Sequence, residues 1–442
     1  MKKILLLSCS LCLCFVNAQN ITFTDSLLKG ALINSPDVGY STSFKDLSGN
    51  VIESVDANND GEVSVSEAQN IENIDLYYLP FTDLEGLQFF TNVKTINALN
   101  GLATTFNFPQ LVNLEKLVFN AFSGQQTLID FNVSSNLNLK ELELYAGNAA
   151  VVDLSNNINL RELRIYDGSA DQILNLDNLV NLRKLTYFGN ISTLNISDCV
   201  RLIEIYINYI SAPDIALSSL DLTNQPLLIN LNISNSNITT LDLSANQNLE
   251  SVFVQGNQLQ SINFGNLLYV RTLYCEDNQI TSLDLNNFQN LNVLSCSNNN
   301  LTELKLKNFR IEEFVNFSGN PNLQYVCCDS EQRVYIQNQA LLSGNFDTIV
   351  DSDCVSEGIL GTETVENLQD KISLFPNPTQ DYVTISNVGT IESNTLFDLN
   401  GRVIKVINGG SNRIDVSDLE NGIYFVNIKT NNTLETLKFI KE

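Results

Sequence analysis

The sequence contains no histidine and no tryptophan, and it has a single methionine. Of these absences, that of histidine excludes the largest number of enzyme classes, because histidine is the commonest general base of enzymes and a frequent ligand of catalytic metals. Serine–histidine–aspartate triads, cysteine–histidine pairs and histidine-ligated zinc sites are therefore ruled out. Since the sequence also offers no activated nucleophile, we expect that the chain is not an enzyme.

Basic residues are scarce as well. Lys and Arg number 24 against 50 Asp and Glu, so the formal net charge is −26. Binding to nucleic acid or to an anionic lipid surface needs clustered Lys and Arg, and neither partner is expected here. An acidic chain suits calcium, cationic partners or neutral glycans better.

Long apolar runs are confined to the first residues. Two lysines precede the apolar segment 4–16, and Ala18 ends a small-residue cleavage site. This order is typical of a secretory signal peptide, so residues 1–18 are predicted to be removed. Lipoprotein processing at Cys9 is an alternative that would leave almost no apolar region. No segment has the length and apolarity of a transmembrane helix.

An internal repeat dominates the following residues. From about Leu84 to Cys328 the chain returns to the pattern L-x-x-L-x-L-x-x-N in steps of 20 to 26 residues, most often 21. Its later apolar positions, at period two, predict a short strand facing inward, and a second apolar pair predicts an extended return segment. The pattern resembles leucine-rich repeats, which implies that each copy forms one turn of a solenoid. The predicted fold class is mostly β, a curved leucine-rich-repeat solenoid over residues 84–328.

One asparagine follows the strand in each of four successive copies. The resemblance implies that its side chain bonds backbone groups inside the turn, so that the asparagines form a ladder. They are Asn257, Asn278, Asn299 and Asn320.

The outward positions of the predicted strands carry aromatic residues in register. Rigid rings contribute large contact areas at binding surfaces, which favours a ligand-binding concave face. Strands also favour aromatic residues without any ligand, so a structural role is the alternative. The six candidates are Tyr145, Tyr166, Phe188, Tyr206, Phe253 and Tyr274. Paired carboxylates such as Glu141 and Glu143 could serve a glycosidase, although a solvated acidic strand face is the simpler interpretation.

A twelve-residue segment before the repeats, DANNDGEVSVSE, matches the calcium-loop pattern D-x-[DN]-x-[DN]-G-x5-E. Residues 19–83 around it resemble an N-terminal cap of secreted Bacteroidota repeat proteins, here with an EF-hand-like loop. The pattern predicts one structural calcium ion, with Gly61 at the sharp turn. A solvated acidic turn is the alternative. The predicted ligands are Asp56, Asn58, Asp60, the backbone oxygen of Glu62, Ser64 and bidentate Glu67.

Six cysteines remain after residue 18. Residues 329–354 are predicted to close the solenoid. Cys328 is in phase with the core and Cys327 is not, which makes Cys327 the better disulfide partner for Cys354, although connectivity cannot be read from sequence alone. The others are expected to be small buried hydrophobic residues: Cys199, Cys275 and Cys296.

Composition changes again near the end of the sequence. Residues 355–367 are polar and acidic, which predicts a linker. Residues 368–442 contain short alternating strands separated by turn signals such as Asn400-Gly401, which predicts an antiparallel β-sandwich. An ordinary adhesive sandwich is one interpretation of this domain.

Three stretches of that domain, LFPNPTQDYVTI, FDLNGRVI and LENGIYFVNI, resemble the C-terminal sorting domain of the bacterial type IX secretion system. The resemblance implies a Bacteroidota source and passage through the outer membrane. It also implies removal of the domain, with release of the protein or its attachment at the cell surface.

These features predict a secreted or cell-surface protein that binds an extracellular protein or glycan through its concave face. The type IX secretion machinery is the partner expected for the C-terminal domain. A structural surface component without a specific ligand is the alternative, and a polysaccharide-acting enzyme is less favoured.

Overall fold

The computed structural model describes most of the chain. The described residues are 19–34, 42–99, 101–120, 130–147, 151–167, 173–208, 216–354, 372–386, 390–399, 401–409, 411–430 and 434–442. The predicted signal peptide, 1–18, and the predicted linker, 355–367, lie outside them. The chain divides into two compact units, before and after Leu323–Gln324, and each is described by itself.

The first unit begins with a small mixed cap. Its helices are α1 (Ser26–Leu32), α2 (Val65–Ala68) and the 3-10 helix η1 (Leu87–Phe89). Its strands are β1 (Thr42–Asp46), β2 (Val51–Ile52) and β3 (Ile71–Tyr77). Strand β1 pairs antiparallel with both β2 and β3. Strand β3 then pairs parallel with the first strand of the repeats, so the cap extends the repeat sheet and does not merely cover it.

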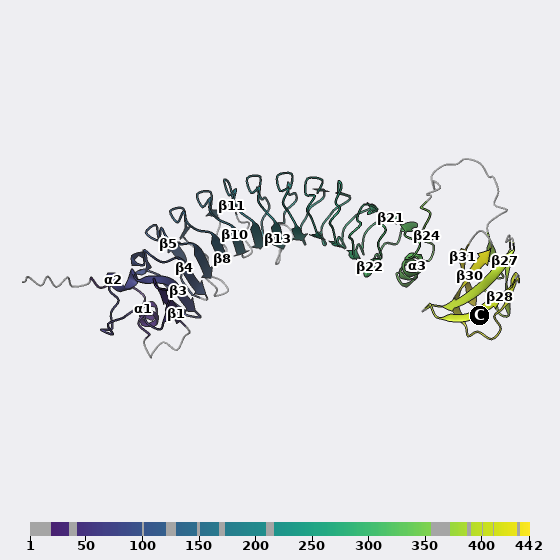
Figure 1. Cartoon of the computed structure of the whole chain (residues 1–442), viewed down its shortest axis with the longest axis horizontal. Helices are drawn as coiled ribbons and strands as arrows, with labels where there is room; N and C mark the ends of the chain where they lie inside the picture. Colours follow the sequence, from purple (N-terminus) through teal and green to yellow (C-terminus); the bar gives the residue numbers. More distant parts are fainter. Residues whose placement is uncertain are drawn as a thin grey trace, which may run out of the picture. The chain divides into compact units, whose positions relative to one another are not determined.

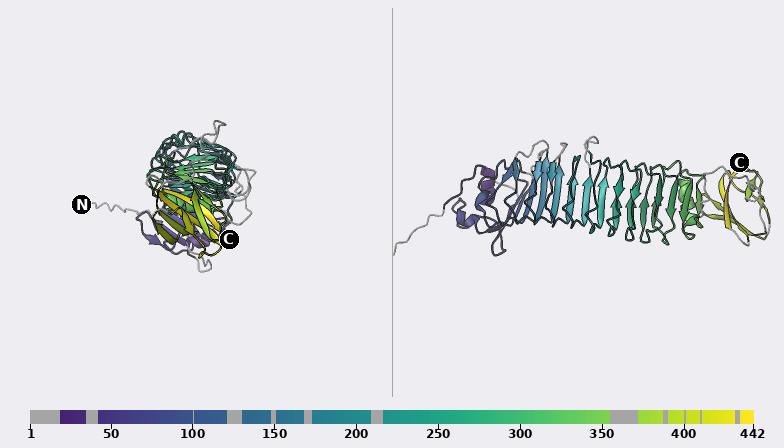
Figure 2. Two further views of the ribbon diagram at one scale, coloured as in Figure 1. Left: turned by 90° about the vertical axis from the view of Figure 1, so that its right-hand side faces the viewer. Right: turned by 90° about the horizontal axis from the view of Figure 1, so that it is seen from above.

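A long parallel sheet follows the inner side of the arc formed by the repeats (Figure 1). Neighbouring strands pair parallel, and Figure 2 shows them side by side in consecutive turns. Because apolar side chains alternate with outward ones, Leu163, Leu185 and Ile205 stack in the core. The repeat strands of this sheet are β4 (Thr95–Leu99), β6 (Lys116–Asn120), β8 (Glu141–Gly147), β10 (Glu162–Asp167), β12 (Lys184–Phe188), β13 (Glu204–Asn208), β14 (Asn230–Ser234), β16 (Ser251–Phe253), β18 (Thr272–Tyr274), β20 (Val293–Ser295) and β22 (Phe314–Asn316).

The return side of each turn is extended, as predicted, and carries shorter strands on the outer side of the arc (Figure 1). They pair parallel as β5–β7, β9–β11, β15–β17 and β19–β21. These strands are β5 (Thr105–Asn107), β7 (Asp130–Asn132), β9 (Val151–Asp153), β11 (Ile173–Asn175), β15 (Leu241–Asp242), β17 (Ile262–Asn263), β19 (Ser282–Asp284) and β21 (Glu303–Leu306). The predicted fold class, a mostly β leucine-rich-repeat solenoid, is confirmed.

The predicted asparagine ladder is present in the core of the turns. The amide nitrogen of Asn278 donates to the carbonyl of Val254 at 2.9 Å in the preceding turn and to that of Cys275 at 3.2 Å in its own turn. Its Oδ1 accepts from the backbone N–H of Leu259 at 2.9 Å. Asn257, Asn299 and Asn320 make the same set of bonds. Each side chain therefore joins two neighbouring turns.

A second ladder runs along the return side and was not predicted. Buried Asn136, Asn157 and Asn246, with Gln225, donate to backbone carbonyls of the preceding turn. The amide of Asn246, for example, lies 2.9 Å from the carbonyl of Leu222. Buried backbone groups of the return side are satisfied in this way without strand pairing at every turn.

The predicted core cysteines are buried. Cys275 and Cys296 occupy the same core column of adjacent turns, and Cys199 lies on the return side. Burial raises the pKa of all three thiols, that of Cys199 to about 12, with a smaller contribution from Asp198. They are therefore protonated and act as small hydrophobic side chains at neutral pH.

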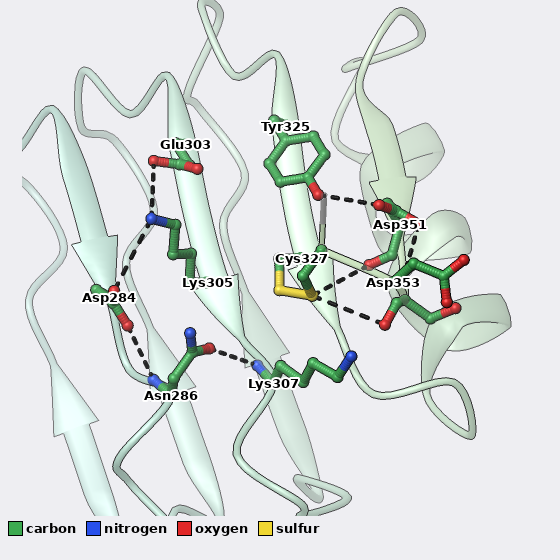
Figure 3. Close-up of a disulfide and its surroundings, with 11 residues drawn as sticks. Asp284, Asn286, Glu303, Lys305, Lys307, Tyr325, Cys327, Asp351 and Asp353 are labelled. Atoms are coloured by element: carbon green, nitrogen blue, oxygen red, sulfur yellow. Dashed lines mark hydrogen bonds and ion pairs between the residues drawn. A yellow bond between two sulfur atoms is a disulfide. The ribbon is translucent and has the colours of Figure 1, made fainter. Parts of the chain in front are cut away.

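The second unit starts with the closing cap. Strand β23 (Tyr325–Cys328) pairs parallel with β24 (Ile349–Asp351), and helix α3 (Arg333–Leu342) connects them. A disulfide joins Cys327 to Cys354, the pair that phase favoured, with 5.1 Å between their Cα atoms. Figure 3 shows it beside the hydrogen bond from the Tyr325 hydroxyl to the Asp351 carboxylate, at 3.1 Å.

The remainder of the second unit is the predicted antiparallel domain. One sheet has the order β25-β26-β29 and the other β28-β27-β30-β31. A shared apolar core, including Val383, Leu396, Ile414 and Phe439, lies between them. The strands are β25 (Ser373–Phe375), β26 (Tyr382–Ser386), β27 (Ile391–Asp398), β28 (Val403–Asn408), β29 (Arg413–Asp415), β30 (Gly422–Thr430) and β31 (Leu434–Lys441).

Replacing one ladder asparagine should weaken the whole array. We expect Asn278→Ala to lower the free energy of unfolding by about 2–4 kcal/mol, because it leaves buried backbone groups in two turns without partners. Urea denaturation followed by circular dichroism measures the change. Asn290→Ala is the control, since its exposed side chain makes one bond, to the Leu268 carbonyl at 2.8 Å, and should cost only about 0.5–1 kcal/mol. Equal losses in both variants would contradict a special role for the buried ladder.

The disulfide should stabilise the closing cap through the loop of 27 residues that it closes. We expect Cys354→Ala to cost about 2–4 kcal/mol, because it frees this loop in the unfolded chain. Denaturation with and without a reductant measures the change. The reductant should destabilise the unmodified protein by a similar amount and leave the variant unaffected; an unmodified protein that is insensitive to reductant would oppose the prediction.

Candidate functional site

The six predicted aromatic residues all lie on the outward face of the inner sheet, and their rings form two groups. In the first group Tyr145 and Tyr166 stack with ring centroids 4.4 Å apart, and Tyr166 and Phe188 stack at 5.3 Å. Tyr206 adds a tilted contact to Phe188 at 5.1 Å. This group is called the aromatic ladder below.

Strand register explains this stacking. Tyr145, Tyr166 and Phe188 are direct partners on β8, β10 and β12. Tyr206 belongs to the neighbouring column, where it pairs with Thr186, so its ring meets that of Phe188 at an angle of 38°. Parallel strands in a fixed register place identical positions next to each other, which brings the rings into contact.

The second group is a pair on β16 and β18. Phe253 and Tyr274 are direct register partners and stack at 5.2 Å with an angle of 14° between the rings. Asn232, on β14, lies between them and Tyr206 in the same column. The concave face therefore carries a four-ring ladder and a two-ring pair separated by an amide.

Charged residues beside the aromatic ladder are paired with each other. Lys116 contacts Glu141 at 2.9 Å, and Lys184 contacts Glu204 at 3.3 Å. Arg164 contacts Glu162 at 3.0 Å. These carboxylates are thus compensated by basic residues on the same strand or on an adjacent one.

Glu143, one of the two carboxylates considered for a glycosidase, is also engaged. It accepts a hydrogen bond from the Tyr145 hydroxyl at 3.1 Å and lies 3.9 Å from Arg164. Burial, with the nearby Glu143 charge, raises the pKa of Tyr145 to about 12. The phenol is neutral at physiological pH and can donate a hydrogen bond.

The face beyond the aromatic ladder is largely uncharged. The outward residues of β14 to β22 include Asn230, Asn232, Ser251, Thr272 and Ser295. Glu276 is an exception, and burial raises the pKa of its carboxyl. The concave face therefore combines a self-neutralised charged region with a polar amide- and hydroxyl-rich region.

The predicted calcium loop folds into a closed turn in the cap. Asp56 is buried, and its carboxylate accepts the backbone N–H groups of Asp60 at 3.2 Å and Gly61 at 2.8 Å. Gly61 has a φ of +83°, which accounts for glycine at the sixth position. Asn58 and Asp60 accept backbone N–H groups two residues ahead, at 2.8 and 2.9 Å.

Glu67 brings the two ends of the loop together. Its carboxylate accepts from the backbone of Ala57 at 2.9 Å and from the backbone and hydroxyl of Ser64 at 2.8 Å each. Although burial acts in the opposite direction, these bonds hold the pKa of Glu67 below its usual value. Ser64 caps α2 in a capping box with Glu67. The loop thus starts and ends at one place, as a calcium loop requires.

For the remaining predicted ligand, Glu62, the predicted calcium ligand is the backbone oxygen, so its side chain is free for another contact. Its side chain points to Lys29 and forms an ion pair at 2.6 Å. The loop is further fixed by a short bridge, in which Ile21 donates to the carbonyl of Val63 at 2.8 Å and Val65 donates to that of Gln19 at 2.9 Å.

The loop residues fit calcium in their chemistry, since all of the predicted donors are oxygens and Glu67 joins the two ends of the loop. The carboxylates are used for backbone hydrogen bonds, and the described part of the chain has no group of three or more Asp, Glu, His or Cys side chains that could hold a metal ion. The donor set and the loop closure therefore support a calcium site, whereas the side-chain positions are those of a hydrogen-bonded loop.

Comparison with known families identifies the C-terminal domain. Residues 373–442 match the family described as secretion system C-terminal sorting domain. These residues are a secretion sorting domain. The sorting domain marks the chain for type IX secretion, to the cell surface or to the medium. No helix in the described ranges is long and apolar enough to cross a membrane.

Comparison with solved structures finds repeat proteins. An internalin, InlF, from Listeria monocytogenes is 19% identical, with 70% of this chain and 90% of that chain covered and a TM-score of 0.43. The functional domain of InlJ from the same organism is 16% identical, with 86% and 93% covered and a TM-score of 0.45. A leucine-rich-repeat protein of Leptospira interrogans is 15% identical, with 64% and 91% covered and a TM-score of 0.30. No curated protein matches the chain.

Proposed function

We propose that this secreted protein binds an extracellular protein through the concave face of its repeats. The observation that carries the proposal is the pair of aromatic groups held in strand register on an otherwise polar, charge-compensated face. Stacked rings are already ordered before binding, so little conformational freedom is lost when a partner contacts them. A long rigid surface of this kind suits a macromolecular partner.

Ring stacking favours a protein partner over a glycan. A sugar ring usually packs on an open aromatic face, but Tyr166 lies between Tyr145 and Phe188, so both of its faces are covered. What these rings offer outward is their edges and the tyrosine hydroxyls, which suit peptide groups and side chains. Tyr206 is the most exposed of the six, at 36%, and lies nearest the uncharged part of the face.

Compensated charges support recognition without catalysis. A glycosidase needs one carboxylic acid and one carboxylate aimed at a bond, with pKa values held apart. Glu141 and Glu143 instead have Lys116, Arg164 and Tyr145 as partners. Their surroundings favour a structural and electrostatic role on a binding surface.

We also infer that residues 56–67 bind one calcium ion that rigidifies the N-terminal cap. Support comes from the oxygen-only donor set, the buried Asp56, the positive φ of Gly61 and the approach of Glu67 to the start of the loop. An ion there would replace backbone N–H groups as the partner of the carboxylates. Binding to the folded loop would stabilise the cap. Because β3 follows the loop and pairs with the first strand of the repeats, the first repeat would be stabilised as well.

Binding through the concave face can be tested with the triple variant Tyr206→Ala/Phe253→Ala/Tyr274→Ala. The purified protein is immobilised and exposed to extracellular protein fractions and to a glycan array, and each ligand found is then titrated. The triple variant should bind its protein ligand at least about tenfold more weakly, because exposed aromatic anchors dominate such interfaces. Tyr269→Ala is the control, since Tyr269 is 54% exposed and lies outside the inner sheet.

Each other outcome has a definite meaning. Unchanged binding in the triple variant would place the site away from these three residues, either at the stack of Tyr145, Tyr166 and Phe188 or off the concave face. Binding to glycans alone would replace a protein partner with a carbohydrate. A protein that binds neither class would be better explained as a structural surface component.

Calcium binding is tested by isothermal titration and by thermal unfolding with calcium or a chelator. Calcium at a hundredfold excess over its Kd should stabilise the cap by about 2.7 kcal/mol, and Asp60→Asn should remove most of that gain. Asp46→Asn is a matched control, because Asp46 forms an exposed hydrogen-bonded turn in the same cap but outside the loop. The proposal fails if calcium releases no heat and the unfolding temperature is the same in both buffers.

A further inference from the structure

The return side of the solenoid is interrupted between β11 and β15, beyond β11 on the outer side of the arc (Figure 1). Two consecutive return segments, 193–195 and 219–221, form no strand. In this described stretch, their backbone N–H and C=O groups make no hydrogen bond to a neighbouring turn. The interruption coincides with the longest repeat, which spans 26 residues from Leu202 to Leu228.

A groove of about 360 Å³ lies over this interruption. Its apolar part consists of Ile173, Leu174 and Leu194, and its polar part includes Asn195 and Asp221. Ile173 is 64% exposed although it belongs to a strand. The volume falls at the lower end of the roughly 300–1,000 Å³ of typical binding sites.

Unpaired backbone groups give this groove a chemical preference. Alternate residues of a parallel strand direct their N–H and C=O groups to opposite sides. The Asn175 carbonyl accepts from Leu154 on the β9 side, so the backbone groups of Leu174 face the groove. Together with segments 193–195 and 219–221, they offer main-chain donors and acceptors in one place, which suits an extended peptide.

The charged residues of the return segments around the groove are acidic, and the basic residue that borders them, Arg201, contacts Asn181 at 2.9 Å. The return segments 173–181, 193–200 and 217–226 contain no Lys or Arg. Their aspartates, Asp177 and Asp198 included, are exposed and form no ion pair in this part of the structure. The concave face differs, because its acids have basic partners. A ligand of the groove should therefore be positively charged.

Asp221 is the charged residue that lines the groove. Its Oδ1 accepts the backbone N–H and the hydroxyl of Thr223, at 2.9 and 2.7 Å. These bonds fix the carboxylate and hold its pKa below the usual value. Its Oδ2 is left to accept a hydrogen bond from a cationic side chain.

We propose that the return-side groove formed by Ile173, Leu174, Leu194, Asn195 and Asp221 binds an extended, lysine- or arginine-containing peptide segment of another protein. Apolar side chains of the segment contact the leucines, its backbone bonds the unpaired groups of the return segments, and its cationic side chain meets Asp221. This site is separate from the concave face and does not depend on the function proposed for it.

The test uses the purified full chain and a fluorescent, end-capped heptapeptide of alternating lysine and valine, with an alternating glutamate–valine peptide beside it. Fluorescence anisotropy should show binding of the lysine peptide alone, weakened by salt. Asp221→Asn should raise its Kd about two- to fivefold, the effect of losing one exposed ion pair. Leu194→Arg, which places a cation in the groove, should abolish binding.

Asp242→Asn is the matched control, because Asp242 occupies the same position one turn later and makes the same turn, to Ser244 at 2.8 Å, outside the groove. It should leave the Kd unchanged. An equal effect of both asparagine variants would reduce the interaction to diffuse charge attraction and overturn the proposal. So would no binding of the lysine peptide, or binding that survives in a Leu194→Arg protein with unchanged circular dichroism.

Discussion

The structure depends on how each turn satisfies the backbone groups that it buries. A solenoid turn of 21 residues reverses direction twice, and the polar groups at those reversals are removed from water. Asparagine side chains supply the missing partners. Asn257, Asn278, Asn299 and Asn320 each offer an amide donor to two carbonyls and an acceptor to an N–H group. Because each bond set spans two turns, the ladder also determines how one turn lies on the next.

Because the turns are held in a fixed relation, the side chains of successive repeats lie next to each other on the surface in a fixed order. Equivalent positions of successive strands become direct neighbours, so a recurrent aromatic position becomes a stack of rings and a recurrent acidic position needs a cation beside it. The concave face meets this need with Lys116, Arg164 and Lys184. Around the return-side groove, Asp177, Asp198 and Asp221 are exposed and form no ion pair among the described residues, whereas Asp284 and Glu303 further along both contact Lys305. The concave face is thus charge-compensated, whereas the return side around the groove is acidic.

Much of this could be predicted from the sequence, because phase along the chain translates directly into position in the sheet. The Asn278 ladder, the core location of Cys275 and the outward column of Tyr145, Tyr166 and Phe188 all follow from a 21-residue step. The disulfide follows from the same logic, since Cys327 falls out of phase and Cys328 does not. Local periodicity is sufficient to predict a residue's place in the structure wherever the same role recurs in successive repeats.

Other features depend on spatial relations that phase does not contain. Asn136 and Asn157 resemble ordinary polar turn residues in the sequence, and only their burial reveals a second ladder. The contact of Tyr206 with Phe188 crosses between columns, so it depends on ring orientation. The groove beyond β11 exists because two return segments fail to pair, and pairing depends on how an inserted repeat is accommodated. In the calcium loop, the motif specifies donors and a turn, while carboxylate positions depend on whether an ion or an N–H group is their partner.

The register of the inner sheet also fixes the spacing between side chains on the concave face. Neighbouring parallel strands are separated by about 4.8 Å, so the rings from Tyr145 to Tyr206 are spaced at nearly equal intervals along the solenoid. The amide at Asn232 interrupts the series before Phe253 resumes it. A partner that contacts both groups must therefore present its own apolar groups at a matching interval, with a polar group opposite the gap. Under the proposed function, spacing would therefore matter as well as chemistry, because a partner with the right residues at the wrong interval would contact only one group at a time.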